Sequence, residues 1–65
     1  MRSFVKWFDI EKGYGFAFYS EYEDVFIHYS VIKDNGFKVL SEGQEIEFDI
    51  KKTDKGLQAI NVKVS

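Results

Sequence analysis

The chain has 65 residues and a mass of 7.6 kDa, and nine basic against eleven acidic side chains give it a net charge of −2. A hydrophobic share of 45% argues against disorder, and the absence of cysteine excludes disulfides and thiolate metal sites. No apolar run approaches the roughly 18 residues of a membrane-spanning helix. We therefore expect residues 1–65 to form a single small cytoplasmic domain, with no leader peptide and no cofactor.

Apolar and polar residues alternate between the glycines, which is typical of half-buried strands. The pattern predicts strands over residues 3–10, 14–19, 24–29, 45–51 and 57–64, with one helical turn at 30–32 and a chain turn at Asp34–Gly36. Short strands in so small a chain indicate an all-β, five-stranded antiparallel barrel, because closing the sheet buries one face of each strand. An SH3-like barrel, with other connections between the strands, stays open as an alternative.

Aromatic residues make up 18% of the chain, more than a small core easily holds. In the third expected strand, alternation sets Val25 and Ile27 on one face and Phe26 and His28 on the other. A core with Phe26 inside would also bury His28, which is unfavourable, so we expect Val25 and Ile27 to face inward. The expected outer set is Tyr14, Phe16, Phe26 and His28, with Phe18 at its edge. Exposed rings of this kind stack on unpaired bases, each contact contributing about 1–3 kcal/mol.

Two short segments carry a family resemblance. Lys12–Phe16 (KGYGF) resembles the first ribonucleoprotein motif, and Val25–Tyr29 (VFIHY) resembles the second. With Val5–Phe8 (VKWF) before them and Gly36–Lys38 (GFK) after them, the chain is similar to the bacterial cold-shock proteins over nearly its whole length. This resemblance implies an OB-type barrel that binds single-stranded DNA and RNA and acts as an RNA chaperone. Because His28 has no serine in a nucleophile context near it, we expect that the chain is not an enzyme.

The same resemblance implies a set of contact residues, carried over position by position. The stacking residues would be Trp7, Tyr14, Phe16, Phe26, His28, Tyr29 and Phe37. Polar contacts with phosphates or base edges would come from Lys6, Lys12, Asp24, Lys38 and Lys55. Strict alternation puts Tyr29 on the inner face, so its outward role rests on the resemblance and on its position at a strand end. Alternation with Val5 is also compatible with a core position for Trp7, and that alternative stays open.

The chain departs from the family pattern at several positions. Ser3-Phe4 stands early in the first strand, where the family usually carries a glycine. Phe18 replaces a usual polar residue, and Leu57 replaces a usual proline. Ala17 is smaller than usual and Ile60 is larger. Because protein interiors are closely packed, we hypothesise that Ile60 fills the space beside Ala17 inside the barrel.

A second class of function also stays open. An SH3-like barrel could bind an extended, proline-rich peptide on the aromatic face, and the acidic balance favours this slightly. Lys6, Lys12 and His28 beside the rings favour nucleic acid instead. The acidic side chains at 45, 47 and 49 have a spacing that glycosidases use, but without a cleft or second wall they indicate a solvated face. We expect a monomer, although the long stretch 30–44 leaves room for a strand-swapped dimer.

Overall fold

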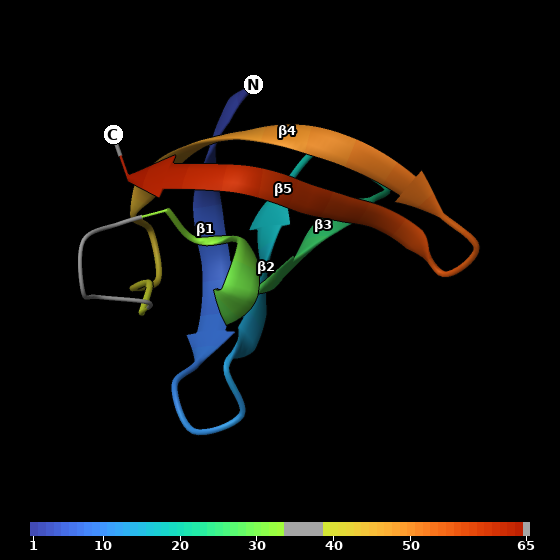
Figure 1. Cartoon of the computed structure of the whole chain (residues 1–65). Coiled ribbons are helices and arrows are strands. Elements are labelled where there is room, and N and C mark those ends of the chain that lie inside the picture. The colour runs from blue at the N-terminus through green and yellow to red at the C-terminus, as the bar shows by residue number, and fades with distance from the viewer. Residues whose placement is uncertain (34–38, 65) are drawn as a thin grey trace.

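The computed structural model describes residues 1–33 and 39–64. The elements within these residues are β1 (Arg2–Asp9), β2 (Tyr14–Phe18), β3 (Asp24–His28), the 3₁₀ turn η1 (Tyr29–Val31), β4 (Glu45–Thr53) and β5 (Gly56–Val64) (Figure 1). Each strand lies within two residues of its expected bounds, which confirms the interpretation of the alternating pattern. The turn expected at Asp34–Gly36 and the site residues Phe37 and Lys38 lie outside the described residues.

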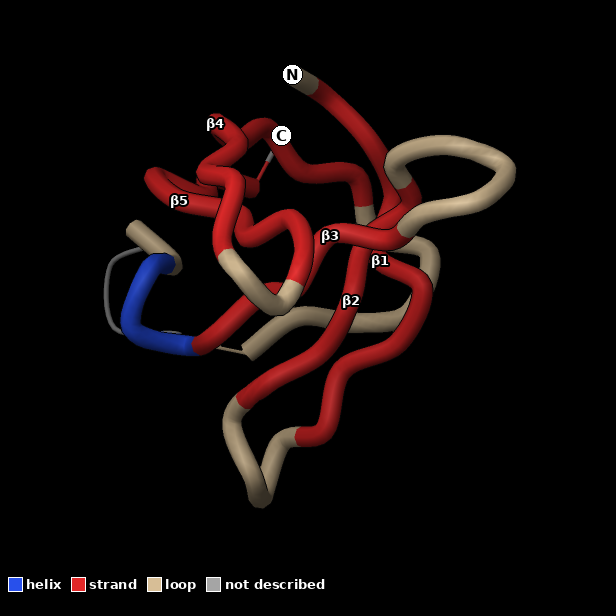
Figure 2. Tube along the Cα trace, turned by 90° about the vertical axis from the view of Figure 1, so that its right-hand side faces the viewer, coloured by secondary structure: helices blue, strands red, loops and turns tan. Residues whose placement is uncertain are grey.

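The strands form a closed barrel in the order β1-β2-β3-β5-β4, and β1 pairs with β4 to complete it. The long hairpin of β4 and β5 arches across β1, β2 and β3 (Figure 1), and the β1–β2 connection projects from one end (Figure 2). This strand order confirms the OB-type barrel and not the SH3-like alternative. One pairing differs from the expected antiparallel sheet, because β3 and β5 run parallel where Val25 lies opposite Leu57.

The barrel interior is filled by aliphatic side chains and one phenylalanine. Val25 and Ile27 are completely buried, so the proposed orientation of β3 is confirmed and the inverse orientation is wrong. On β4, Ile46 and Phe48 face inward. The other buried core members are Val5, Ala17, Ile32, Leu40, Ala59 and Val62. Within the described residues, no helix has the length and apolarity that a membrane crossing requires.

The alternation of β5 is interrupted at Asn61, whose left-handed φ of 53° is uncommon outside glycine. Ala59 and Val62 are both buried although they are three positions apart, so Ile60 and Asn61 together occupy the outer side of the strand. Ile60 lies outside the core cluster, and Ala59 and Val62 take the interior positions. The hypothesis that Ile60 fills the space beside Ala17 was therefore wrong, because the local bulge turns its side chain outward.

Candidate nucleic-acid interface

Trp7 reaches the outer surface through an irregularity in β1. Val5 lies opposite Ala17 while Trp7 lies opposite Phe16, so two steps along β1 match one step along β2. This bulge turns the following side chain to the other face. Val5 is fully buried and Trp7 is 37% exposed, although simple alternation would put them on the same face. The core alternative for Trp7 was therefore wrong.

Trp7, Tyr14, Phe16 and Phe26 form a closed cycle of ring contacts, which we call the four-ring cluster. The Trp7 ring centroid lies 5.6 Å from that of Tyr14 and 5.3 Å from that of Phe16. The Phe26 ring completes the cycle at 5.8 Å from Tyr14 and 5.6 Å from Phe16. The rings meet edge to face or tilted, which are favourable geometries. Each ring is thus held by two others while the cluster remains accessible on the outer face of β1, β2 and β3.

The two glycines of the KGYGF segment each make room for an aromatic residue. A Cβ atom on Gly15 would collide with the carbonyl oxygen of Trp7 and lie 2.7 Å from the Cα atom of Phe8, so only glycine lets β2 approach β1 this closely. Gly13 has a φ of +74°, and a Cβ atom there would lie 2.7 Å from the Tyr29 ring. The Gly13 carbonyl oxygen also accepts a hydrogen bond from the Tyr29 N–H at 2.9 Å. The motif therefore positions both Trp7 and Tyr29.

His28 and Tyr29 continue the aromatic surface from the end of β3. Their ring centroids are 4.5 Å apart. Nδ1 of His28 accepts a hydrogen bond from the Ser30 backbone N–H at 3.3 Å and lies 2.8 Å from the Ser30 hydroxyl oxygen, so Ser30 orients the ring. Tyr29 is 45% exposed because η1 begins there and ends the alternation of β3. Its outward orientation agrees with the position that the resemblance implies.

Lys6 and Asp24 contact each other, a pairing that the sequence did not reveal. Lys6 Nζ lies 3.0 Å from Asp24 Oδ2, with 45% and 31% of the two side chains exposed. An ion pair this accessible to water contributes about 0–1 kcal/mol, so Lys6 can turn to a phosphate at small cost. Lys12, also among the expected contacts, is exposed in the β1–β2 connection, where its backbone N–H donates to Asp9 Oδ1 at 3.0 Å.

A groove of about 520 Å³ lies beside Phe16 and Phe26 and reaches the β4–β5 turn. Lys55, one of the expected contacts, lines it together with Thr53 and Gln58. Gln58 lies opposite Phe26 in the parallel pairing of β3 and β5, and its amide can both donate to and accept from a base edge. Sequence reasoning missed Thr53 and Gln58, because only the pairing of distant strands brings them to the rings.

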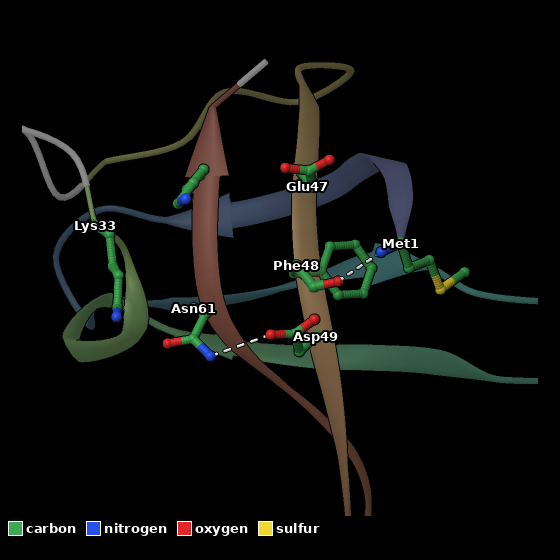
Figure 3. Close-up of a pocket in the computed structure, with 7 residues that line it drawn as sticks. Met1, Lys33, Glu47, Phe48, Asp49 and Asn61 are labelled. Atoms are coloured by element: carbon green, nitrogen blue, oxygen red, sulfur yellow. Dashed lines mark hydrogen bonds between the residues drawn. The ribbon is translucent and has the colours of Figure 1, made fainter.

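Another hollow, of about 470 Å³, lies over β4 and β5 (Figure 3). The Met1 amine donates to the Phe48 carbonyl oxygen at 2.9 Å, and Asn61 Nδ2 donates to Asp49 Oδ2 at 3.1 Å. Charged side chains of both signs line it, namely Lys33, Lys63, Glu47 and Asp49. Phe48 is only 1% exposed, so this hollow offers no ring face for stacking. The groove beside the four-ring cluster is therefore the better candidate site.

Comparisons with known proteins agree with this geometry. The sequence model of the family described as the "cold-shock" DNA-binding domain matches residues 1–65. A cold shock-like protein of Thermotoga maritima is 56% identical over 64 residues, which cover 98% of this chain and 97% of that protein. Cold shock-like protein CspB of Bacillus cereus is 52% identical over 95% of each chain. The solved structure of drosophila Unr CSD456 has a similar fold, with a TM-score of 0.70 at 22% identity over all of this chain and 27% of that one.

Proposed function

The chain belongs to the cold-shock domain family, and we propose that it binds single-stranded RNA and DNA by stacking unpaired bases on the four-ring cluster. The observation that carries this proposal is the cycle of partly exposed rings on three adjacent strands. Every base has a π face, so such a surface accepts many sequences, with about 1–3 kcal/mol for each stacked base. His28 and Tyr29 extend the stacking surface, and Phe37 is proposed to join it.

Lysines around the rings supply a modest electrostatic attraction to the phosphates. Lys55 lies in the groove beside the cluster, Lys6 lies near its edge and Lys12 lies in the neighbouring connection. Lys38 is proposed as a further contact, and Asp24 as an acceptor for a base edge. With a net charge of −2, the chain as a whole has no basic field, so stacking provides most of the affinity.

The proposed biological role is that of an RNA chaperone. A base stacked on a protein ring is removed from the stack of its own strand and is less available for pairing, so bound transcripts stay open. We propose that residues 1–65 act as one monomeric domain in the cytoplasm. The pairing of β1 with β4 supports the monomer, because a closed barrel leaves few strand edges for a second copy.

We propose that binding is not coupled to catalysis. The acidic side chains of β4 are exposed at Glu45, Glu47 and Asp49. Glu47 lies 3.5 Å from the Arg2 guanidinium, and Asp49 accepts from Asn61. Among residues 1–33 and 39–64, His28 is oriented by Ser30, whereas a carboxylate orients the histidine of a catalytic triad. These contacts support a solvated acidic face and a histidine that binds.

Titration of Trp7 fluorescence tests the proposed function, because Trp7 is the only tryptophan and lies in the four-ring cluster. Single-stranded oligo-dT should quench this fluorescence in a saturable way. A duplex of the same length should bind much more weakly, because its bases already stack on each other. Saturable binding of a proline-rich peptide with no response to oligo-dT would support the peptide-binding alternative instead.

A further inference from the structure

Phe18 continues the aromatic row beyond the four-ring cluster. β2 pairs with β3 without interruption from Tyr14 opposite His28 to Phe18 opposite Asp24. Phe18 therefore points to the same side as Phe16, about 6.5–7 Å further along the strand. Its side chain is 47% exposed. The spacing from Tyr14 to Phe16 is thus repeated once more towards the end of β2.

A second exposed ring lies across from Phe18 on β1. Val5 pairs with Ala17 in the antiparallel β1–β2 ladder. The next position along the ladder sets Phe4 across from Phe18, on the outer side of the two strands. Phe4 is 52% exposed. The Ser3 hydroxyl donates a hydrogen bond to the Phe18 carbonyl oxygen, which ties the strand ends together. The result is a pair of exposed rings on the same outer face as the four-ring cluster, one side-chain step beyond Phe16 on β2.

Lys6 adds a positive charge to this pair of rings. Its Nζ lies 5.8 Å from the centroid of the Phe18 ring and 3.0 Å from Asp24 Oδ2. A phosphate of a strand that passes over Phe18 would come within reach of this ammonium group. The exposed ion pair costs little to rearrange, so Lys6 can exchange the carboxylate for the phosphate. The combination of a ring and a lysine at the main site is thus repeated here.

We infer that Phe18, bordered by Phe4, is an additional stacking position for one more base of the strand bound on the four-ring cluster. The inference rests on the proposed function. The occupant is a base of the same strand because Phe18 lies on the same face of β2 as the cluster, keeps its ring spacing and has a cation beside it.

Oligonucleotide length separates this position from the main site. We would measure the binding of labelled oligo-dT of about four and about eight nucleotides by fluorescence anisotropy. Phe18→Leu, which keeps an apolar side chain but removes the π face, should weaken binding of the longer oligonucleotide at least about five-fold. Binding of the shorter one should be unchanged. Phe18→Tyr is the matched control and should bind both lengths like the wild type.

Three outcomes would overturn the inference. Unchanged binding of the longer oligonucleotide by Phe18→Leu would show that no base stacks there. Equal losses at both lengths would show that Phe18 only supports the four-ring cluster, and thermal unfolding of the variant would identify a general loss of structure. A wild-type dimer in sedimentation that Phe18→Leu dissociates would assign the pair of rings to a second copy. Failure of the wild type to bind either length would contradict the proposed function itself.

Discussion

Replacing Phe26 by leucine separates base stacking from packing on the outer face of β3. Phe26 and Trp7 both contact the rings of Tyr14 and Phe16, and they lie on opposite sides of the cycle. Trp7 therefore remains a usable fluorescent reporter in the Phe26→Leu variant. Leucine keeps an apolar side chain on the strand and removes the face on which a base would stack.

The expected losses follow from these contacts. One stacked base contributes about 1–3 kcal/mol, so the dissociation constant for oligo-dT should rise about 5- to 150-fold. Each ring contact of Phe26 contributes about 0.5–1.5 kcal/mol to folding, and leucine retains part of both contacts. The free energy of unfolding should therefore fall by less than about 2 kcal/mol.

Ile27→Val is the matched control, because Ile27 is the next residue of β3 and is completely buried. Removing one buried methylene costs about 0.5–1.5 kcal/mol of stability. The two variants should thus unfold at similar urea concentrations, while only Phe26→Leu loses affinity. Unimpaired oligo-dT binding by Phe26→Leu, or an equal loss of affinity in Ile27→Val, would refute the assignment of faces on which the site depends.

Three further predictions concern the glycines, the phosphates and the bulge of β5. Gly15→Ala should cost about 1–3 kcal/mol of stability in urea unfolding and weaken oligo-dT binding in titration, because the new methyl displaces the β1 backbone. Gly43 has a φ of +82° but open space around it, so Gly43→Ala should cost about 1–2 kcal/mol of stability and leave oligo-dT binding unchanged. With about two or three phosphates neutralised, log K should fall against log salt with a slope of about −1.5 to −2, and Lys55→Ala should make the slope shallower by about 0.7; a slope beyond about −4 would contradict this electrostatic account. Ile60→Ala should cost less than about 1 kcal/mol in urea unfolding and Val62→Ala about 2 kcal/mol or more, and the reverse order would place Ile60 in the core.

Local alternation determined much of the fold. A pleated strand turns successive side chains to opposite faces, so residues 14–18 and 24–28 could be divided into inner and outer sets without knowledge of their neighbours. The glycines of KGYGF were recognisable as a motif, and the resemblance assigned the stacking role to the surrounding rings. Burial of Val25 and Ile27 confirmed the division of residues 24–28 into an inner and an outer face.

The tertiary structure decided the features that depend on a partner strand. The bulge that turns Trp7 outward is visible only in the unequal pairing of β1 with β2, and the bulge at Asn61 turns Ile60 away from the core. The parallel pairing of β3 with β5 brings Gln58 beside Phe26. Alternation is a property of one strand, whereas a bulge and a register depend on backbone hydrogen bonds with another strand. Residues far apart in the chain therefore became neighbours only when the barrel closed.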